Sequence, residues 1–350
     1  MRILVIDYLT YLGHRNFNKI HIESLLKTGI DMHVIGRRQA MSLIEPSDRL
    51  KVSFLPEWAS KSFPLKSLSE RIKNVAELYW IKRNFDIEQY DAIVFLAYDV
   101  LSLCTFRTNR PTFVINHNNV SQLKNIMKLC LTRRLPLNYK HIVLSKDSEE
   151  ELIRLIPKRS VNFVPHGFLR DNGVTIKPLY LKEDEKFLFC PVNGNYDVDF
   201  VKSLFSSTQI LNFLSDNNIK LVAKEKLFVN SQNCQIISIK GRIPEEEYRY
   251  YLGNALAVIL PYSKDFKYRC SGILYECISV NTPVIASQIE TLDMYRDLIQ
   301  IKFFRNVSEF IDNIQYFLNS TRSKVDNTIF VPDNYWEQIL KAINANVYNL

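Results

Sequence analysis

Short apolar runs alternate with amphipathic segments along almost the whole chain of 350 residues. In the first half, the apolar runs predict strands at 2–7, 32–36, 51–55, 92–96, 112–116, 141–145 and 161–165. Helical periodicity between them predicts helices at 18–29, 68–85, 123–134 and 146–156. Apolar strands that are joined by helices are typical of a parallel sheet covered on both faces.

The same pattern restarts after residue 167. It predicts strands at 186–192, 219–224, 234–241, 256–262, 282–287 and 298–304, and helices at 198–207, 208–216, 244–253, 272–280 and 307–321. We therefore predict an α/β fold with two Rossmann-like, doubly wound parallel-sheet domains, 1–166 and 167–330, that face a cleft. The last helix, within 331–350, has no strand after it and is predicted to cross back onto the first domain.

The net charge of +8 is concentrated in the first half of the chain. Residues 1–166 contain 25 Lys and Arg against 16 Asp and Glu, and within 49–134 the basic residues are interleaved with Trp, Phe and Leu. This pattern favours an anionic membrane surface or lipid head group as a partner, with an ordinary solvated basic face as the alternative. No nucleic-acid-binding motif accompanies the charge, so nucleic acid is not an expected partner.

Compartment is indicated by the cysteines and by the start of the chain. The six cysteines are scattered without a CxxC pair, which is typical of a reducing compartment. The opening MRILVIDYL is too short an apolar run for a signal peptide, and no run of about 18 apolar residues follows. We expect a cytoplasmic protein, with peripheral attachment to the cytoplasmic membrane face as an option.

The stretch YRCSGILYECISVNTPVIAS contains the strongest candidate site. With Ser271 as the N-cap and Gly272 as the first helical residue, a helix N-terminus offers backbone N–H groups to a phosphate. Glu276 lies one turn further on the same side, where a carboxylate can accept hydrogen bonds from two ribose hydroxyls. Arg269 and Lys224 supply positive charge for a diphosphate. The alternative is a capped helix with a surface glutamate.

An ordered set of motifs resembles the GT-B glycosyltransferases, in particular the large retaining, nucleotide-sugar-dependent group (glycosyl transferases group 1). The matching segments cover most of the chain: LGHRNFNKIHIESLLKTGIDMHVIG at 12–36, HIVLSKDSEEEL at 141–152, VPHGF at 164–168, IISIKGRIPEEEYRYYLGNALAVILPY at 236–262 and NTPVIAS at 281–287. The resemblance implies that the first domain binds the acceptor and the second binds the nucleotide-sugar donor.

The resemblance also assigns roles by position. It implies that Gly13 approaches the donor phosphates, Lys224 binds the diphosphate, Glu276 holds the nucleotide ribose and His117 lines the reaction centre. This chain departs from the family at Tyr268, where members with a paired-glutamate motif have its first glutamate. The identity of the sugar and the retaining or inverting outcome therefore stay open.

Two histidines are the candidate catalytic residues. His14 follows Gly13 and is either a general base for an inverting transfer, a residue that positions the acceptor, or an ordinary loop histidine. For His117, the alternative to a place in the reaction centre is a strand-end histidine bonded to the backbone. Asn281 replaces the family's usual glycine, and it tolerates the left-handed conformation that this turn requires.

The function implied by the resemblance is a metal-independent transferase of the hexosyltransferase type. It would move a sugar from a nucleotide-diphosphate donor, a co-substrate that needs no further cofactor, to a hydroxyl of a saccharide or lipid-linked saccharide in surface polysaccharide or glycan biosynthesis. The alternatives are a nucleotide-sugar epimerase of the same fold and a non-catalytic nucleotide-sugar or glycan-binding protein.

Overall fold

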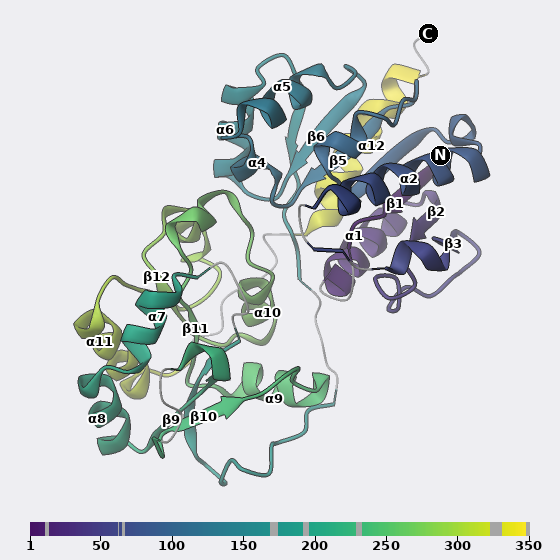
Figure 1. Cartoon of the computed structure of the whole chain (residues 1–350). Coiled ribbons are helices and arrows are strands. Elements are labelled where there is room, and N and C mark those ends of the chain that lie inside the picture. Colours follow the sequence, from purple (N-terminus) through teal and green to yellow (C-terminus); the bar gives the residue numbers. More distant parts are fainter. Residues whose placement is uncertain are drawn as a thin grey trace. The chain divides into compact units, whose positions relative to one another are not determined.

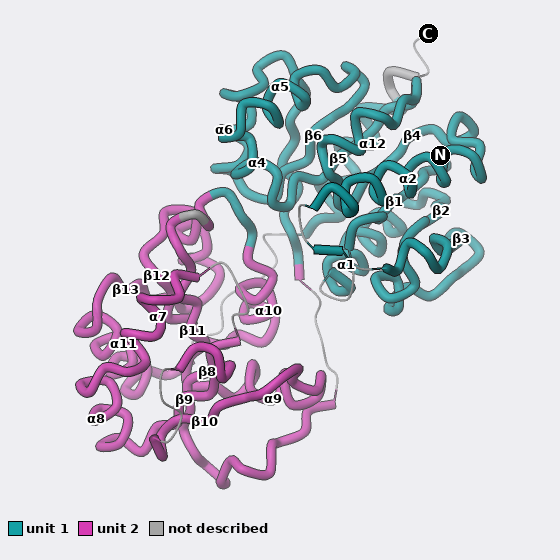
Figure 2. Tube along the Cα trace, in the orientation of Figure 1, with its two compact units in different colours: residues 1–167, 268–270, 330–350 teal, residues 168–267, 271–329 magenta. Residues whose placement is uncertain are grey.

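The chain forms two compact units (Figure 2). Unit 1 comprises Met1–Gly167, Tyr268–Cys270 and Phe330–Leu350, and unit 2 comprises Phe168–Lys267 and Ser271–Ile329. The computed structural model describes the chain except residues 11–13, 62, 65–66, 169–173, 192–195, 229–232, 323–330 and 348–350, and the side chains of 265 and 345–347.

Unit 1 is built on a seven-stranded parallel sheet with the order β3-β2-β1-β4-β5-β6-β7 (Figure 1). The strands are β1 (Arg2–Asp7), β2 (Asp31–Gly36), β3 (Leu50–Phe54), β4 (Ala92–Ala97), β5 (Thr112–Asn116), β6 (Tyr139–Val143) and β7 (Val161–Phe163). The strand order reverses between β1 and β4, so the sheet is doubly wound. All seven predicted strands of the first half are present.

The helices of unit 1 are α1 (Arg15–Lys27), α2 (Leu68–Asn84), α3 (Val100–Leu103), α4 (Asn119–Gln122), α5 (Ile126–Arg134), α6 (Lys146–Leu155) and α12 (Pro332–Val347). One core of this unit lies between α2, α3 and the sheet. It includes Ile93 and Phe95 of β4 together with Leu78 and Ile81 of α2.

The helix predicted at 123–134 is present as α5, but it begins three residues later, at Ile126. The Asn125 side chain accepts a hydrogen bond from the Lys128 backbone N–H and caps the start of this helix. The short helix α4, which precedes it, was not predicted. The four-residue helix α3 was also not predicted, since it is too short to show a periodic pattern.

Unit 2 repeats the arrangement with a six-stranded parallel sheet, β10-β9-β8-β11-β12-β13. Its strands are β8 (Lys186–Cys190), β9 (Ile219–Lys224), β10 (Ile236–Ile239), β11 (Ala257–Leu260), β12 (Val284–Ser287) and β13 (Ile301–Phe304). Its helices are α7 (Val198–Phe205), α8 (Thr208–Asp216), α9 (Glu245–Asn254), α10 (Gly272–Val280) and α11 (Val307–Asn319). Both predicted parallel sheets are therefore confirmed.

The C-terminal helix α12 packs on unit 1, as the sequence predicts. Its Trp336 is fully buried, and the indole Nε1 donates to His21 Nδ1 of α1 at 3.2 Å. At the start of the helix, Lys27 Nζ of α1 lies 3.0 Å from Asp333 Oδ2. The main-chain turn at Gly167 (φ +71°) also fits against Pro332, and a Cβ at this glycine would meet the proline ring at 2.5 Å.

Candidate functional site

The candidate donor site lies at the carboxyl edge of the sheet of unit 2. The strand order reverses between β8 and β11, and α10 begins after the carboxyl end of β11. Doubly wound sheets bind ligands at such a reversal, outside the carboxyl ends of their strands. The structure therefore places Ser271, Gly272 and Glu276 beside the position where a ligand of this unit is expected.

The start of α10 is fixed by side-chain hydrogen bonds. Ser271 is the N-cap, and its Oγ accepts from the Leu274 backbone N–H at 3.0 Å. The same Oγ lies 2.6 Å from the hydroxyl of Tyr262, whose ring stacks on Phe266. Gly272 is the first helical residue, as predicted. These contacts hold the N-terminal N–H groups of α10 in a defined direction.

Glu276 is held by a second tyrosine. The hydroxyl of Tyr248 in α9 donates to Glu276 Oε2 at 2.5 Å. Burial, with the neighbouring Glu276 carboxylate adding to it, raises the pKa of Tyr248 well above 10, so the phenol keeps the proton that it donates. The carboxylate of Glu276 is thus a positioned, half-buried group and not a loose surface charge.

Lys224 ends β9, two strands from β11 at the same edge. Because neighbouring strands lie about 4.8 Å apart, its backbone is roughly 10 Å from the end of β11. The lysine is largely buried, and its ammonium donates to the carbonyl of Gly241. Burial, and to a smaller extent Lys226, lowers the pKa of Lys224. The buried Lys224 ammonium is poorly solvated, and a diphosphate bound here would give it a direct contact with negative charge.

The helix ends as the sequence predicts. Asn281 adopts the left-handed conformation (φ 54°, ψ 42°) at the C-cap of α10, and the backbone N–H groups there return to the carbonyls of Cys277 and Ile278. Asparagine therefore occupies the turn where the resemblance implies glycine.

Unit 1 gathers four of the six histidines around one phenylalanine. This imidazole cluster consists of His14, His21, His117 and His166 about the ring of Phe17. The His14 and His117 ring centroids are 4.6 Å apart, and the His117 and Phe17 centroids are 4.7 Å apart. The two histidines predicted to be catalytic, which are 103 positions apart in the sequence, are therefore neighbours at the carboxyl edge of this sheet.

The histidines of the cluster are neutral near pH 7. Burial lowers the pKa of His21 to about 3 and that of His166 to about 4, with a further lowering by a neighbouring imidazole in each case. Burial, and then His14 and His166, lowers the pKa of His117 well below 6.5. Burial also lowers the pKa of His14, but the Asp7 carboxylate opposes that shift. A neutral imidazole is the form that can accept a proton.

Two rings of the cluster have an Nδ1 without a partner. His14 Nδ1 and His117 Nδ1 are buried and make no hydrogen bond within the described part of the chain. The other two rings are anchored through this atom: His21 Nδ1 accepts from Trp336, and His166 Nδ1 donates to the Gly167 carbonyl at 2.9 Å. Within the described residues, His14 and His117 are therefore the two members of the cluster that are not anchored through Nδ1.

Two predicted site residues are not placed in these arrangements. Gly13 lies outside the described residues. Arg269 lies in the segment Tyr268–Cys270, whose contacts group it with unit 1, so its role toward the donor stays a prediction. Three residues of the two arrangements carried no sequence signal for a site, namely His21, Trp336 and Tyr248, because each is brought there by another segment of the chain.

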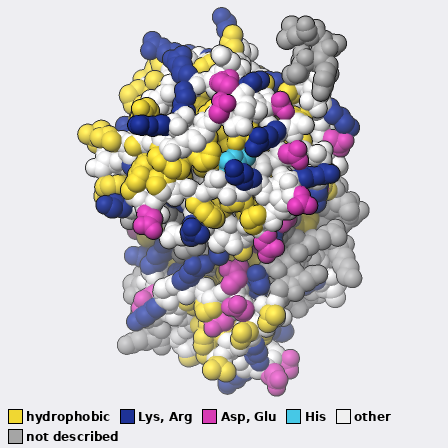
Figure 3. Space-filling view, turned by 90° about the vertical axis from the view of Figure 1, so that its right-hand side faces the viewer, with side chains coloured by type: hydrophobic (Ala, Val, Ile, Leu, Met, Phe, Trp, Pro, Cys, Tyr) yellow, Lys and Arg dark blue, Asp and Glu magenta, His cyan; other side chains and the backbone are white. Residues whose placement is uncertain are grey.

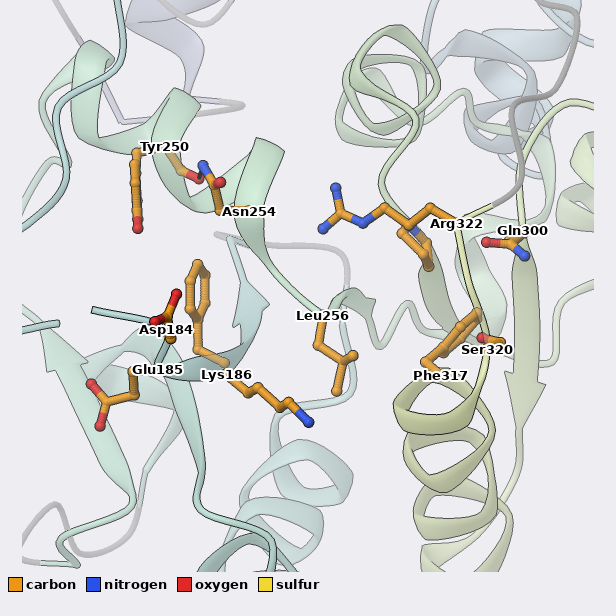
Figure 4. A pocket seen from close by; sticks show the side chains of 12 residues that line it. Asp184, Glu185, Lys186, Tyr250, Asn254, Leu256, Gln300, Phe317, Ser320 and Arg322 are labelled. Atoms are coloured by element: carbon orange, nitrogen blue, oxygen red, sulfur yellow. Dashed lines mark hydrogen bonds between the residues drawn. The ribbon is translucent and has the colours of Figure 1, made fainter. Parts of the chain in front are cut away.

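A cavity of about 370 Å³ lies at the opposite, amino-terminal edge of the unit 2 sheet. Figure 4 shows Tyr250, Asn254 and Asp184 on one side of this cavity and Arg322, Gln300 and Phe317 on the other. The Arg322 guanidinium donates to the carbonyls of Gly253 at 2.7 Å and Ala255 at 2.5 Å, so it closes the carboxyl end of α9. The cavity lies at the other edge of the sheet from Lys224 and Glu276. None of the site residues predicted from the sequence lines it.

Neither metal ligands nor a membrane span is evident in the part of the chain that the structure describes. No three His, Cys, Asp or Glu side chains there converge in a way that could hold a metal ion. No helix among the same residues has the length and apolarity needed to cross a bilayer.

Comparison with known proteins gives matches at the level of structure. No protein-family model and no curated protein matches the sequence. The solved structure of OtsA, a trehalose-6-phosphate synthase, has a TM-score of 0.66 at 8% identity, covering 98% of this chain and 99% of that one. WaaG, a glycosyltransferase involved in lipopolysaccharide biosynthesis, has a TM-score of 0.58 at 12% identity, covering 98% and 99%. The chain has the GT-B fold.

Other GT-B neighbours catalyse a different kind of reaction. The UDP-GlcNAc 2-epimerase of Methanocaldococcus jannaschii has a TM-score of 0.61 at 13% identity, covering 99% of this chain and all of that one. The predicted GT-B fold is thus confirmed over nearly the full length. Because the neighbours include a synthase, a transferase and an epimerase, the fold by itself is compatible with more than one reaction.

Proposed function

We propose that this GT-B protein is a glycosyltransferase that moves a sugar from a nucleotide-diphosphate donor to a hydroxyl of a saccharide or lipid-linked saccharide. The donor binds at the carboxyl edge of unit 2, and the acceptor binds on unit 1. A role in surface polysaccharide or glycan biosynthesis follows from this acceptor class, and the protein works at the cytoplasmic face of a membrane.

One observation carries the proposal: Glu276, the capped N-terminus of α10 and Lys224 share the edge of one sheet at the reversal of its strand order. A nucleotide diphosphate needs these three kinds of group, a carboxylate for ribose hydroxyls and positive or N–H donors for phosphates. Similar GT-B structures are recorded in complex with UDP-GlcNAc and UDP, and with UDP-2-fluoro glucose.

The leaving group is stabilised by fixed positive groups. As the sugar departs, negative charge builds on the diphosphate, and the Lys224 ammonium and the N–H groups at the start of α10 are positioned to receive it. We propose that Arg269 adds a third positive contact, as the sequence implies. Because these groups are held in place before the reaction, their reorganisation costs little.

The acceptor hydroxyl loses its proton to the imidazole cluster. We propose His14 as the general base, because its ring is neutral and because the Asp7 carboxylate stabilises the imidazolium that forms. His117 packs against that ring and limits its orientation. The new glycosidic bond forms between the acceptor oxygen and the anomeric carbon as the bond from that carbon to the diphosphate breaks.

Glu276→Gln should weaken binding of the donor nucleotide about 10- to 100-fold, because a charged hydrogen bond contributes about 1.5–3 kcal/mol. Isothermal titration with the nucleotide diphosphate chosen by a thermal-shift screen measures the effect. Glu290→Gln is the control, since Glu290 is an exposed carboxylate of the same unit that pairs with Lys267. Equal affinities of the two variants and the wild type would remove the ribose role of Glu276.

A nucleotide-sugar epimerase is the second candidate, favoured by the similarity to the UDP-GlcNAc 2-epimerase. The two reactions differ in their products. Incubation with a nucleotide sugar and no acceptor should leave the sugar configuration unchanged if the chain is a transferase. An epimeric nucleotide sugar in that mixture, detected by NMR, would support the epimerase and reject the transferase.

A further inference from the structure

Helix α2 of unit 1 exposes an apolar stripe in addition to the apolar residues that it buries. Leu68, Ile72 and Tyr79 are 73%, 61% and 65% exposed, and with Val75 they form one stripe, because residues three or four apart share a helix face. The opposite side carries Leu78 and Ile81, which pack in the core, together with the buried polar residues Lys73, Asn74 and Glu77. The helix is therefore apolar on both sides, and the outer stripe has no partner among the described residues of unit 1.

A buried ion pair holds α2 in this rotation. Arg37 Nη2 of the segment after β2 lies 2.7 Å from Glu77 Oε1, and the two side chains are 2% and 0% exposed. On the same side of the helix, Lys73 Nζ donates to the Lys61 carbonyl at 3.0 Å. Turning the stripe toward the core would remove Glu77 from its buried cation, so the outward position of the apolar stripe is a fixed feature of the fold.

Two aromatic side chains in the segment before α2 are also partly exposed. This segment contains the short helix Glu57–Ser60, whose Trp58 is 38% exposed, and Phe63, which is 39% exposed. Lys73 Nζ of α2 lies 5.8 Å from the centre of the Phe63 ring, so Phe63 lies beside α2. Figure 3 shows hydrophobic side chains gathered on the side of unit 1 that carries α2 and β3, with Lys and Arg side chains at their borders.

Positive charge surrounds the stripe. Residues 57–83 contain six Lys and Arg against three Glu, and the only buried members of that set are Lys73 and Glu77 among the described residues. Arg71 and Lys82 flank one side of the stripe on the helical wheel, and Arg83 flanks the other. An occupant of this surface must offer an apolar layer under a layer of negative charge. An anionic bilayer has that structure, and Trp and Tyr are the aromatic residues favoured at its interface.

We propose that the outer face of α2, with Leu68, Ile72 and Tyr79, is the surface by which the protein binds membranes that contain anionic phospholipid. The apolar side chains enter the boundary between head groups and acyl chains, while Arg71 and Arg83 contact lipid phosphates. The proposal names the surface and lipid class for the membrane association included in the proposed function. It does not depend on the nature of the sugar reaction.

Vesicle flotation of the full-length protein tests this surface. The wild type should float with vesicles of phosphatidylcholine and about 30% phosphatidylglycerol at low salt, and not with phosphatidylcholine alone. Ile72→Ser/Tyr79→Ser should lower the bound fraction at least tenfold, and Arg71→Gln/Arg83→Gln should lower binding and flatten its salt dependence. The matched control is Leu179→Ser/Tyr316→Ser, because both residues are exposed hydrophobics of unit 2, at 103% and 44%.

Three results would overturn the proposal: no flotation of the wild type with anionic vesicles, equal flotation of the α2 variant and the control, or a dimer that only the α2 variant disrupts. The last result, from sedimentation velocity without lipid, would assign the surface to a second copy of the chain. Circular dichroism and nucleotide affinity, measured on the same preparations, show that each variant is folded. They also separate a failure at this surface from a failure of the proposed donor site.

Discussion

The His14→Gln protein should transfer sugar about 100- to 10,000-fold more slowly than the wild type while binding the donor nucleotide equally well, since general-base catalysis contributes that much to a rate. The reason lies in the imidazole cluster. His14 lies beside His117, it has a buried Nδ1 with no hydrogen bond to the described residues, and the nearby Asp7 stabilises its protonated form. Glutamine keeps a polar group of similar size but cannot take up a proton.

The pH dependence of the rate tests the same role. Burial holds the pKa of His14 below 6.5, so the ring is neutral at pH 7. It becomes protonated as the pH falls through its lowered pKa. The wild-type kcat/KM should therefore decline on the acid side of pH 6.5, and the His14→Gln protein should lack this decline. His33→Gln is the control, since that ring is bonded to the Tyr90 hydroxyl and Ser53 away from the cluster. A rate of sugar transfer by His14→Gln equal to that of the wild type would reject the role of His14 as general base.

The second large effect concerns stability. Glu77→Ala should destabilise unit 1 by about 3–5 kcal/mol at pH 7, because it removes the carboxylate that lies 2.7 Å from the buried Arg37 guanidinium. All three tryptophans, Trp58, Trp80 and Trp336, belong to this unit, so their fluorescence during urea unfolding reports on it directly. Glu88→Ala serves as the control. The Arg110–Glu88 pair is 42% and 48% exposed, and breaking such a pair costs about 1 kcal/mol or less.

The pH dependence of this stability has a defined sign. Burial raises the pKa of Glu77 from 4.5 to about 7, and the opposing effect of Arg37 is smaller. The folded protein therefore binds a proton at Glu77 more readily than the unfolded chain does. Protonation of Glu77 therefore adds stability that is full below pH 4.5 and is lost as the pH rises through about 7, while the contact with Arg37 remains. The double variant Arg37→Met/Glu77→Leu should regain most of the stability that Glu77→Ala loses, because it removes both buried charges. If stability does not return, burial of the guanidinium charge is not the cause of the loss.

Local sequence patterns predict much of the fold. Strands such as β1, β4 and β11 are apolar runs, and the caps of α10, Ser271 and Asn281, are residues whose own chemistry favours those positions. The orientation of α2 is different. Its sequence contains apolar residues on two sides, and the side that is buried is the one where Glu77 meets Arg37, a residue 40 positions away. A pattern of 17 residues does not contain that information.

The candidate site shows the same limit. The positions of Glu276 and Lys224 follow from the order of strands, so the resemblance and the topology lead to the same edge of the sheet. The Tyr248 hydroxyl that holds Glu276 comes from α9, and the Trp336 indole that holds His21 comes from 315 positions away. Neither bond has a local sequence signature. The absence of a glutamate at position 268 also leaves the contacts to the sugar itself undetermined by any motif.

The central claim, a nucleotide-diphosphate site on unit 2, is tested most directly by the melting temperature of the protein in a panel of nucleoside diphosphates and nucleotide sugars. A ligand at about 100 times its Kd stabilises the native state by about 2.7 kcal/mol. We predict that diphosphates of one base raise the melting temperature, that the corresponding nucleoside does not, and that Lys224→Ala abolishes the rise. No shift with any nucleotide at millimolar concentration, or an undiminished shift in Lys224→Ala, would contradict the account.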